Sequence, residues 1–243
     1  MSDRLQYITL ISSLPHIGRL FSEHGTGISR YRLDERLTLL ESEHARLLDR
    51  VVSITAWSSV SKIDTDAEVI ALARSVIGDL DLYPDIQNLV RSRMETRTLI
   101  AALRRRREGA REAGDISAWG FGRWCRSIRD NWSDPGFGLS QIMPWVAEAD
   151  RLMKAGDHVA VERLVLTDVF RQIGRHSAGH EFDFTAVVAY VLRWIIVERW
   201  SVYGTAKAAE RLRSLLADAL KSAPPPFAVV PDPESALQQE VHP

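Results

Sequence analysis

The chain has 243 residues, of which 45% are hydrophobic and 26% are charged, a composition typical of a globular protein with one large domain or two small ones. Its formal net charge of −1 gives no long-range field that would attract nucleic acid or an anionic membrane. The single cysteine, Cys125, excludes an intrachain disulfide and favours a reducing compartment.

Residues 1–15 lack the long apolar core and the small-residue cleavage site of a signal peptide. No window of the sequence reaches the roughly 20 apolar residues that a membrane span requires. We therefore expect a cytoplasmic protein, for which peripheral attachment to a membrane through a larger complex stays open.

The N-terminal residues 7–14 (YITLISSL) are β-branched and aromatic and stop at Pro15, which is typical of a short strand or an extended arm. Because no partner strand follows, the pattern favours an extended segment held against a helical body. The glycines of residues 22–29 indicate a loop. We therefore expect residues 1–28 to form an extended arm and a loop.

From Ser29 onward the apolar residues recur at helical spacing, with capping residues and glycines marking where helices begin and end. Polar residues 58–65 indicate a break between helices. The prolines at 224–226 end the last helix, and residues 223–243 have the composition of a flexible tail. The sequence thus predicts an all-α protein of about eight helices, with one helical domain over residues 29–222. Helices are expected near 29–40, 42–57, 66–77, 83–111, 124–128, 143–154, 159–173 and 183–200.

The stretch from Phe184 to Val197 is apolar on nearly every helical face, which is typical of a helix buried in the core. Asp183 is its expected N-cap. Arg193 lies in the most apolar part, so its guanidinium needs a partner. We expect this helix to pack against residues 83–111, with an arginine ion pair near the contact.

Residues 83–111 carry an arginine stripe that interrupts an apolar row. Carboxylates such as Glu95 and Glu108 can satisfy these arginines within the fold, and cations are also favoured at a helix C-terminus. Alternatively, residues 104–107 present a basic patch to an acidic protein partner. Nucleic acid is the weaker alternative, because the chain is not basic overall. The candidate interface residues are Arg93, Arg97, Arg104, Arg105, Arg107 and Arg111.

Four tryptophans lie between residues 119 and 145, where they either bind a partner or pack a loop-rich region onto the helices. Trp119 and Trp124 complete the candidate interface. Cys125 is either a reactive thiol beside Arg126 or, more commonly for a lone cysteine, a small buried side chain.

A cluster of His176, His180, Glu181 and Asp183 permits a metal site, which would make the chain a metal-dependent hydrolase. The order of a zinc protease motif is absent, and the Ser-Ala-Gly between the histidines is typical of a loop. We expect a polar connection here. No catalytic residue, cofactor or metal is predicted for the chain.

Two passages resemble a known family. They are Tyr7 to Pro15 with the later Ile28 and Ser29, and Phe182 to Phe184 with Tyr190, Glu198, Arg199 and Trp200. Both are similar to the bacterial domain-of-unknown-function family encoded beside V-type ATP synthase genes, whose members open with a tyrosine-rich arm ending in "SLP".

The resemblance implies a stand-in for the central-stalk socket, the all-helical protein that links the central shaft of the rotary ATPase to its membrane rotor ring. A full socket protein has three similar lobes and is longer, so this chain would be a reduced version. The implied protein does no chemistry, and its partners are the proteins of the shaft and ring. The alternative from the residues alone is an independent helical adaptor or regulator.

Overall fold

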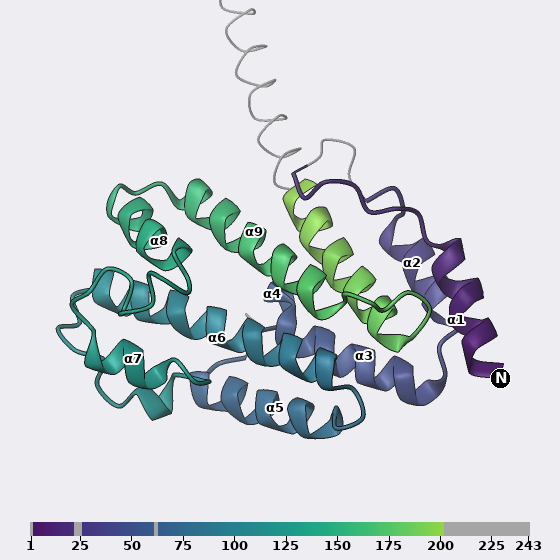
Figure 1. Cartoon of the computed structure of the whole chain (residues 1–243), viewed down its shortest axis with the longest axis horizontal. Coiled ribbons are helices and arrows are strands. Elements are labelled where there is room, and N and C mark those ends of the chain that lie inside the picture. Colours follow the sequence, from purple (N-terminus) through teal and green to yellow (C-terminus); the bar gives the residue numbers. More distant parts are fainter. Residues whose placement is uncertain (1, 22–25, 61–62, 202–243) are drawn as a thin grey trace, which may run out of the picture. The chain divides into compact units, whose positions relative to one another are not determined.

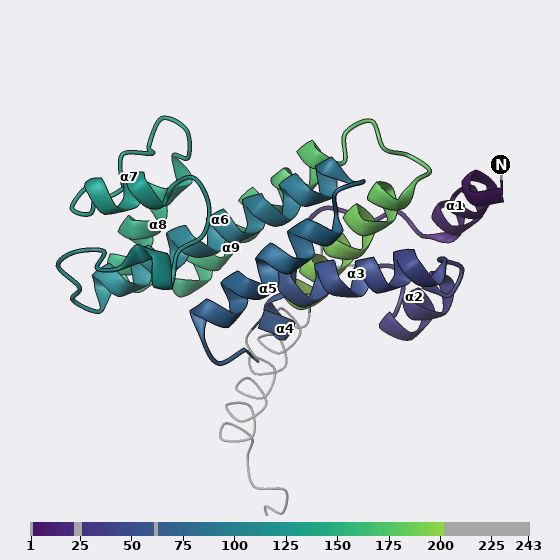
Figure 2. The ribbon, with the colours of Figure 1, turned by 90° about the horizontal axis from the view of Figure 1, so that it is seen from below.

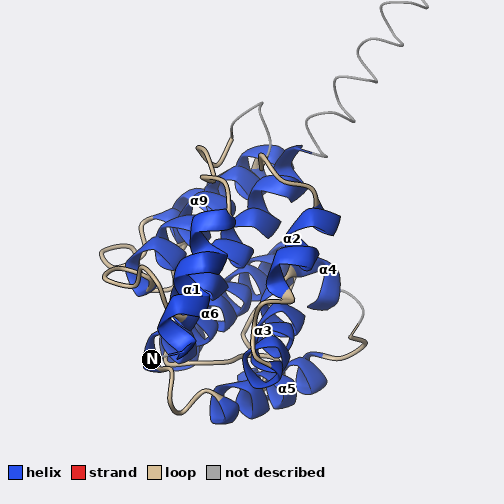
Figure 3. Ribbon diagram, turned by 90° about the vertical axis from the view of Figure 1, so that its right-hand side faces the viewer, coloured by secondary structure: helices blue, strands red, loops and turns tan. Residues whose placement is uncertain are grey.

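The computed structural model describes residues 2–21, 26–60 and 63–201, which are helices joined by loops with no strand among them (Figure 3). The predicted all-α class is confirmed. The expected tail, residues 223–243, and any helix beyond residue 201 lie outside the described residues. The elements are α1 Ser2–Ser13, α2 Arg30–Leu37, α3 Ser42–Thr55, α4 Trp57–Val60, α5 Asp66–Asp79, α6 Pro84–Arg107, the 3-10 helix η1 Ile116–Ala118, α7 Cys125–Asp130, α8 Trp145–Lys154, α9 His158–His176 and an unlabelled helix at 184–201.

Helix α6 is the element around which the described part of the chain is organised. It contacts α3, α5, α7, α8 and α9 (Figures 1 and 2). Pro84 stands in its first turn, where a missing N–H costs nothing. The first half of α6, through Met94, packs in one apolar cluster with α1–α3, α5 and the 184–201 helix. The second half, from Leu99, packs in another with α7 and α8.

The N-terminal segment is helical, so the prediction of an extended arm is wrong for residues 2–13. Tyr7 and Leu10 are buried, and Leu14 packs against the same cluster. Their spacing of three and four residues puts all three on one helical face. Burial of this face outweighs the β propensity of the sequence, because that propensity mostly reflects packing context. Pro15 does end the element, as predicted.

The helix at 184–201 begins where the sequence predicts. The Oδ1 atom of Asp183 accepts a hydrogen bond from the Ala186 N–H at 2.9 Å, which confirms the N-cap. Trp194 is fully buried, in keeping with a core helix. No helix in the described ranges is both long and apolar enough to cross a bilayer.

The expected contact between the 184–201 helix and α6 lies at their first turns. The ring of Phe184 meets Tyr83, the residue before α6, edge to face with centroids 5.0 Å apart. Of the three arginines for which an ion pair near this contact is expected, only Arg97 forms one among the described residues, and its partner is Asp66 of α5. Arg93 donates to a backbone carbonyl, and the guanidinium of Arg193 lies over the Phe170 ring at 5.5 Å.

Helix α9 runs through Gly174 to His176, whereas the sequence predicts a break from residue 174 onward. The side chain of Arg193 lies against this glycine. A β-carbon at Gly174 would lie 3.2 Å from Arg193 Nη2, a tight contact that the end of this side chain would have to relieve by a small shift. The polar break predicted after Trp57 likewise contains the short helix α4.

Candidate protein-docking surface

Arg93 is satisfied inside the fold. Its Nη2 donates to the carbonyl of Thr55 at 2.9 Å. Thr55 is the last residue of α3, and the last carbonyls of a helix lack intrahelical partners. Burial lowers the pKa of Arg93 to about 10, and the Asp168 carboxylate acts in the opposite direction. Arg93 is therefore a cation at neutral pH that caps α3, rather than part of a surface.

Arg97 and Arg105 share one carboxylate. Their Nη2 atoms lie 3.3 Å and 3.4 Å from the two oxygens of Asp66. Asp66 is the first residue of α5, where a negative charge also complements the helix dipole. The three half-exposed side chains join α6 to α5, and each such exposed pair contributes little on its own. These two members of the candidate interface thus have internal partners.

Arg106 has the most extensive set of partners, although no sequence pattern singles it out. Its Nη2 lies 2.7 Å from Asp150 Oδ1, and the two side chains are only 15% and 8% exposed. It also donates to the carbonyls of Trp132, Asp134 and Pro135. Arg106 therefore fastens the loop before α8 to α6. The sequence signal for this network is Asp150, an acidic residue on the buried face of α8, which requires a cationic partner.

Arg104, Arg107 and Arg111 remain exposed, and no ion pair to them is formed by the described residues. Arg104 and Arg107 share a face of α6 because they are three residues apart. The Arg104 guanidinium lies 5.4 Å from the ring centroid of Trp57, which is 48% exposed. The Arg199 guanidinium lies 5.5 Å from the same ring. We call Trp57, Arg104, Arg107 and Arg199 the arginine–tryptophan surface, and Arg111 is exposed beyond the end of α6.

Trp57 is the last residue of the helix that the sequence predicts near 42–57. That helix ends at Thr55, so Trp57 lies beyond it and is exposed. Stacking of a guanidinium on an exposed aromatic ring contributes roughly 0.5–1 kcal/mol. Arg199 is further fixed by Glu162 at 2.8 Å. The surface is therefore partly pre-organised.

The tryptophans of residues 119–145 mostly pack the loop-rich region onto the helices. Trp119 and Trp132 are each 7% exposed, and their rings meet edge to face with centroids 6.5 Å apart. Their Nε1–H groups donate to the carbonyls of Ala113 and Ala110. Trp119, a member of the candidate interface, thus offers little surface. Trp124 is partly buried beneath the guanidinium of Arg123 at 4.6 Å.

The two histidines of the metal hypothesis face different partners. His176 Nε2 lies 3.2 Å from Ser92 Oγ, and burial lowers the pKa of His176. His180 lies between two carboxylates, with Nδ1 2.6 Å from Asp183 and Nε2 3.0 Å from Asp85. Those hydrogen bonds, led by the one to Asp183, raise the pKa of His180.

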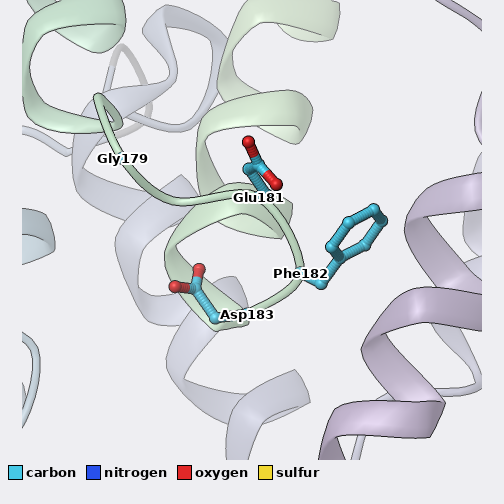
Figure 4. A pocket seen from close by; sticks show the side chains of 4 residues that line it. All are labelled: Gly179, Glu181, Phe182 and Asp183. Atoms are coloured by element: carbon cyan, nitrogen blue, oxygen red, sulfur yellow. The ribbon is translucent and has the colours of Figure 1, made fainter.

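A shallow pocket at this connection is lined by Gly179, Glu181, Phe182 and Asp183 (Figure 4). The carboxylates of Glu181 and Asp183 do not point to a common centre, and the Phe182 ring points away from Asp183. Within the described ranges, no three His, Cys, Asp or Glu side chains are arranged to hold a metal. The geometry is that of a helix connection stabilised by His180.

Burial raises the pKa of the Cys125 thiol. The neighbouring Arg126 is directed to Asp130, with Nε 3.5 Å from Oδ2, instead of to the sulfur. A thiol with a raised pKa is a weaker nucleophile at neutral pH, because the thiolate is the reactive form. The environment therefore favours a packing role for Cys125.

The two passages that carry the family resemblance meet in space. Tyr190 donates from its hydroxyl to the Pro15 carbonyl at 2.9 Å, and burial raises the pKa of Tyr190 to about 12. Trp194 donates from Nε1 to the Ile28 carbonyl at 3.0 Å. We call these two hydrogen bonds the motif junction. No family model matches the chain, and neither curated proteins nor solved structures gave a match.

Proposed function

We propose that the chain is a non-catalytic component of a bacterial V-type rotary ATPase, where it links the central shaft to the membrane rotor ring as the central-stalk socket does. The observation that carries this proposal is the motif junction. Its bonded residues are 175 and 166 positions apart in the sequence, yet they join the N-terminal passage to the 184–201 helix. Contact between the two passages in the fold would account for their occurring together in one sequence.

The arginine–tryptophan surface is the face proposed to dock the shaft. Of the arginines on α6, those at 93, 97, 105 and 106 have internal partners. Near the C-terminal end of the helix this leaves Arg104 and Arg107 available, with Arg111 beyond the helix end, while the exposed Arg91 lies in its first half. A cationic face beside an exposed tryptophan fits an acidic protein surface. Such charges mainly accelerate association and select the partner.

An independent helical adaptor is the second candidate. The arginine–tryptophan surface favours it equally, because an acidic partner outside a rotary ATPase would be recognised by the same charges. The two candidates differ in the identity of the partner. Only the first requires the shaft and rotor-ring proteins to be bound.

Affinity purification from cells that produce the protein tests both candidates. We expect the tagged chain to recover shaft and rotor-ring proteins, and Arg104→Glu/Arg107→Glu/Arg111→Glu to lower the recovered shaft protein about tenfold or more at low salt. The control Arg32→Glu/Arg74→Glu/Arg91→Glu reverses three exposed arginines elsewhere and should bind normally. Recovery of a different partner through the same arginines would favour the adaptor, and equal binding by both variants would refute the docking surface.

A further inference from the structure

A groove separate from the arginine–tryptophan surface lies between the segment that follows α1, the end of α9 and the 184–201 helix. Its volume is about 250 Å³. One wall is the stripe Ala186, Ala189, Tyr190 and Arg193, which share a helical face by their spacing. The N-terminal segment contributes the apolar side chains of Ile11, Leu14, Pro15 and Ile17, together with the exposed His16. The groove thus combines a hydrocarbon wall with one arginine.

Arg193 is half-buried and has no ionic partner among the described residues. Its Nε is buried and makes no hydrogen bond within the described part of the chain, where its guanidinium also forms no ion pair. The Phe170 ring, 5.5 Å from the guanidinium, is its one aromatic contact there. Burial lowers the pKa of Arg193, and no neighbouring carboxylate offsets that effect. Because Arg193 is only half-buried, its unused donors stay accessible to an anion that enters the groove.

The described residues around Arg193 leave space for its guanidinium and form no ion pair with it. Gly174 of α9 leaves room for the guanidinium, since a β-carbon there would lie 3.2 Å from Nη2. Two other polar groups on the walls of the groove already have partners, whereas His16 at its rim is exposed to solvent. Tyr190 donates to Pro15, and His180 is held by Asp183 and Asp85. Arg193 is thus the arginine of the groove, and it has no ionic partner within the described ranges.

We propose that the groove binds an aliphatic carboxylate, whose anionic end pairs with Arg193 and whose hydrocarbon chain lies on Ile11, Leu14 and Ala189. A carboxylate matches the donor geometry of a guanidinium and supplies the missing charge. The volume is below the roughly 300–1,000 Å³ of pockets for drug-sized ligands, so the chain must be short. The ligand is either a free short-chain acid or the carboxylate of a short apolar peptide.

Nuclear magnetic resonance of the full chain labelled with ¹⁵N-arginine tests this directly, because each arginine Nε–H gives its own signal. We expect hexanoate to shift the Arg193 signal saturably, with a dissociation constant on the order of millimolar. Hexanamide, which has the same shape without the charge, should leave that signal in place. Arg193→Lys assigns the signal by its disappearance.

Two variants separate binding from folding. Arg193→Gln should weaken hexanoate binding about tenfold or more, as measured by calorimetry, because the ligand loses its charged partner. Ala186→Leu fills the groove from a partly buried position and should block binding while the Arg193 Nε–H signal persists. Either variant binding hexanoate as the wild type does would overturn the proposal.

The source of the carboxylate is distinguished by a second titration. Acetyl-Ala-Leu-Leu with a free carboxyl terminus is compared with its amidated form and with hexanoate. Tighter binding of the acid peptide than of hexanoate indicates a peptide ligand, and the reverse indicates a free acid. If hexanoate and hexanamide shift the Arg193 signal equally, and the acid and amidated peptides also do so, no carboxylate site exists.

Discussion

The Tyr190 hydroxyl donates a hydrogen bond to the carbonyl of Pro15 across 2.9 Å, and this contact joins the end of the N-terminal segment to the 184–201 helix. The same two residues line the groove that contains Arg193. The motif junction and the proposed carboxylate site are therefore neighbours. Changes to Tyr190 are expected to affect both.

Replacing Tyr190 by Phe removes the hydroxyl and leaves the ring in place. We expect a loss of about 0.5–1.5 kcal/mol in the free energy of unfolding, since the Pro15 carbonyl loses its donor. Tyr31→Phe is the control, because Tyr31 is 78% exposed. Urea unfolding followed by tryptophan fluorescence measures both. Equal stability of the two variants would mean that the Tyr190 hydrogen bond contributes nothing.

His180 makes stability depend on pH. Its pKa in the folded protein is raised by the Asp183 and Asp85 hydrogen bonds. The folded state therefore holds the proton more tightly than the unfolded chain, in which a histidine has a pKa near about 6.5. The stabilisation is complete below that unfolded value and is lost as pH rises through the folded pKa.

The variant His180→Gln should lack this contribution. We expect its deficit in unfolding free energy relative to the wild type to be largest at acidic pH and to shrink above neutral pH. Urea denaturation at intervals from about pH 5 to pH 9 measures the difference. A deficit that grows with rising pH would contradict the predicted direction of the pKa shift.

Arg106→Ala leaves the buried Asp150 with Lys154 as its remaining ionic partner and deprives three carbonyls of their donor. Because Asp150 keeps one cation, we expect a loss of about 1.5–3 kcal/mol, the range for a hydrogen bond to a charged group. Arg126→Ala is the matched control, because the Arg126–Asp130 pair is 86% and 46% exposed and should contribute less than about 1 kcal/mol. Thermal unfolding compares the two. A loss of similar size in both would show that the Arg106 network has no special role.

Gly174 and Gly78 both lie inside helices but have different surroundings. A β-carbon at Gly78 meets no atom within 4 Å, so Gly78→Ala should stabilise by up to about 1 kcal/mol. At Gly174 the added methyl group presses on Arg193, which offsets that gain. We expect Gly174→Ala to be less stabilising than Gly78→Ala, by urea denaturation, and to weaken hexanoate binding. An equal gain at both sites would mean that Arg193 moves freely.

The all-α class and most helix positions follow from the sequence because periodicity and caps are local signals. Asp183 at the N-cap is an example. The start of α3 is predicted to within one residue, but Ser42, expected as its N-cap, is its first helical residue, and the N-cap position is Glu41. The N-terminal helix does not follow, because β-branched residues obscure the face formed by Tyr7, Leu10 and Leu14. Gly174 resembles a helix end in the sequence. The side chain that contacts it, Arg193, lies nineteen residues further along the chain, so no local pattern reveals the contact.

The candidate interface is only partly predictable for a similar reason. The sequence places Arg93, Arg97, Arg104 and Arg107 on one stripe of α6, but it does not show which of them meet a partner from another helix. Asp66 and the Thr55 carbonyl lie more than thirty residues away from their arginines along the chain. These long-range contacts decide which arginines stay available. The exposure of Trp57 likewise depends on where α3 ends.

Ion transport driven by ATP tests the central claim most directly. A protein that links the shaft to the rotor ring is needed for pumping but not for hydrolysis by the catalytic head. In vesicles from cells lacking this gene, we predict that ATP-driven ion uptake is lost, that total ATP hydrolysis by the catalytic head persists, and that the wild-type gene restores uptake. Unchanged ATP-driven ion uptake in the absence of the protein would contradict the proposed function.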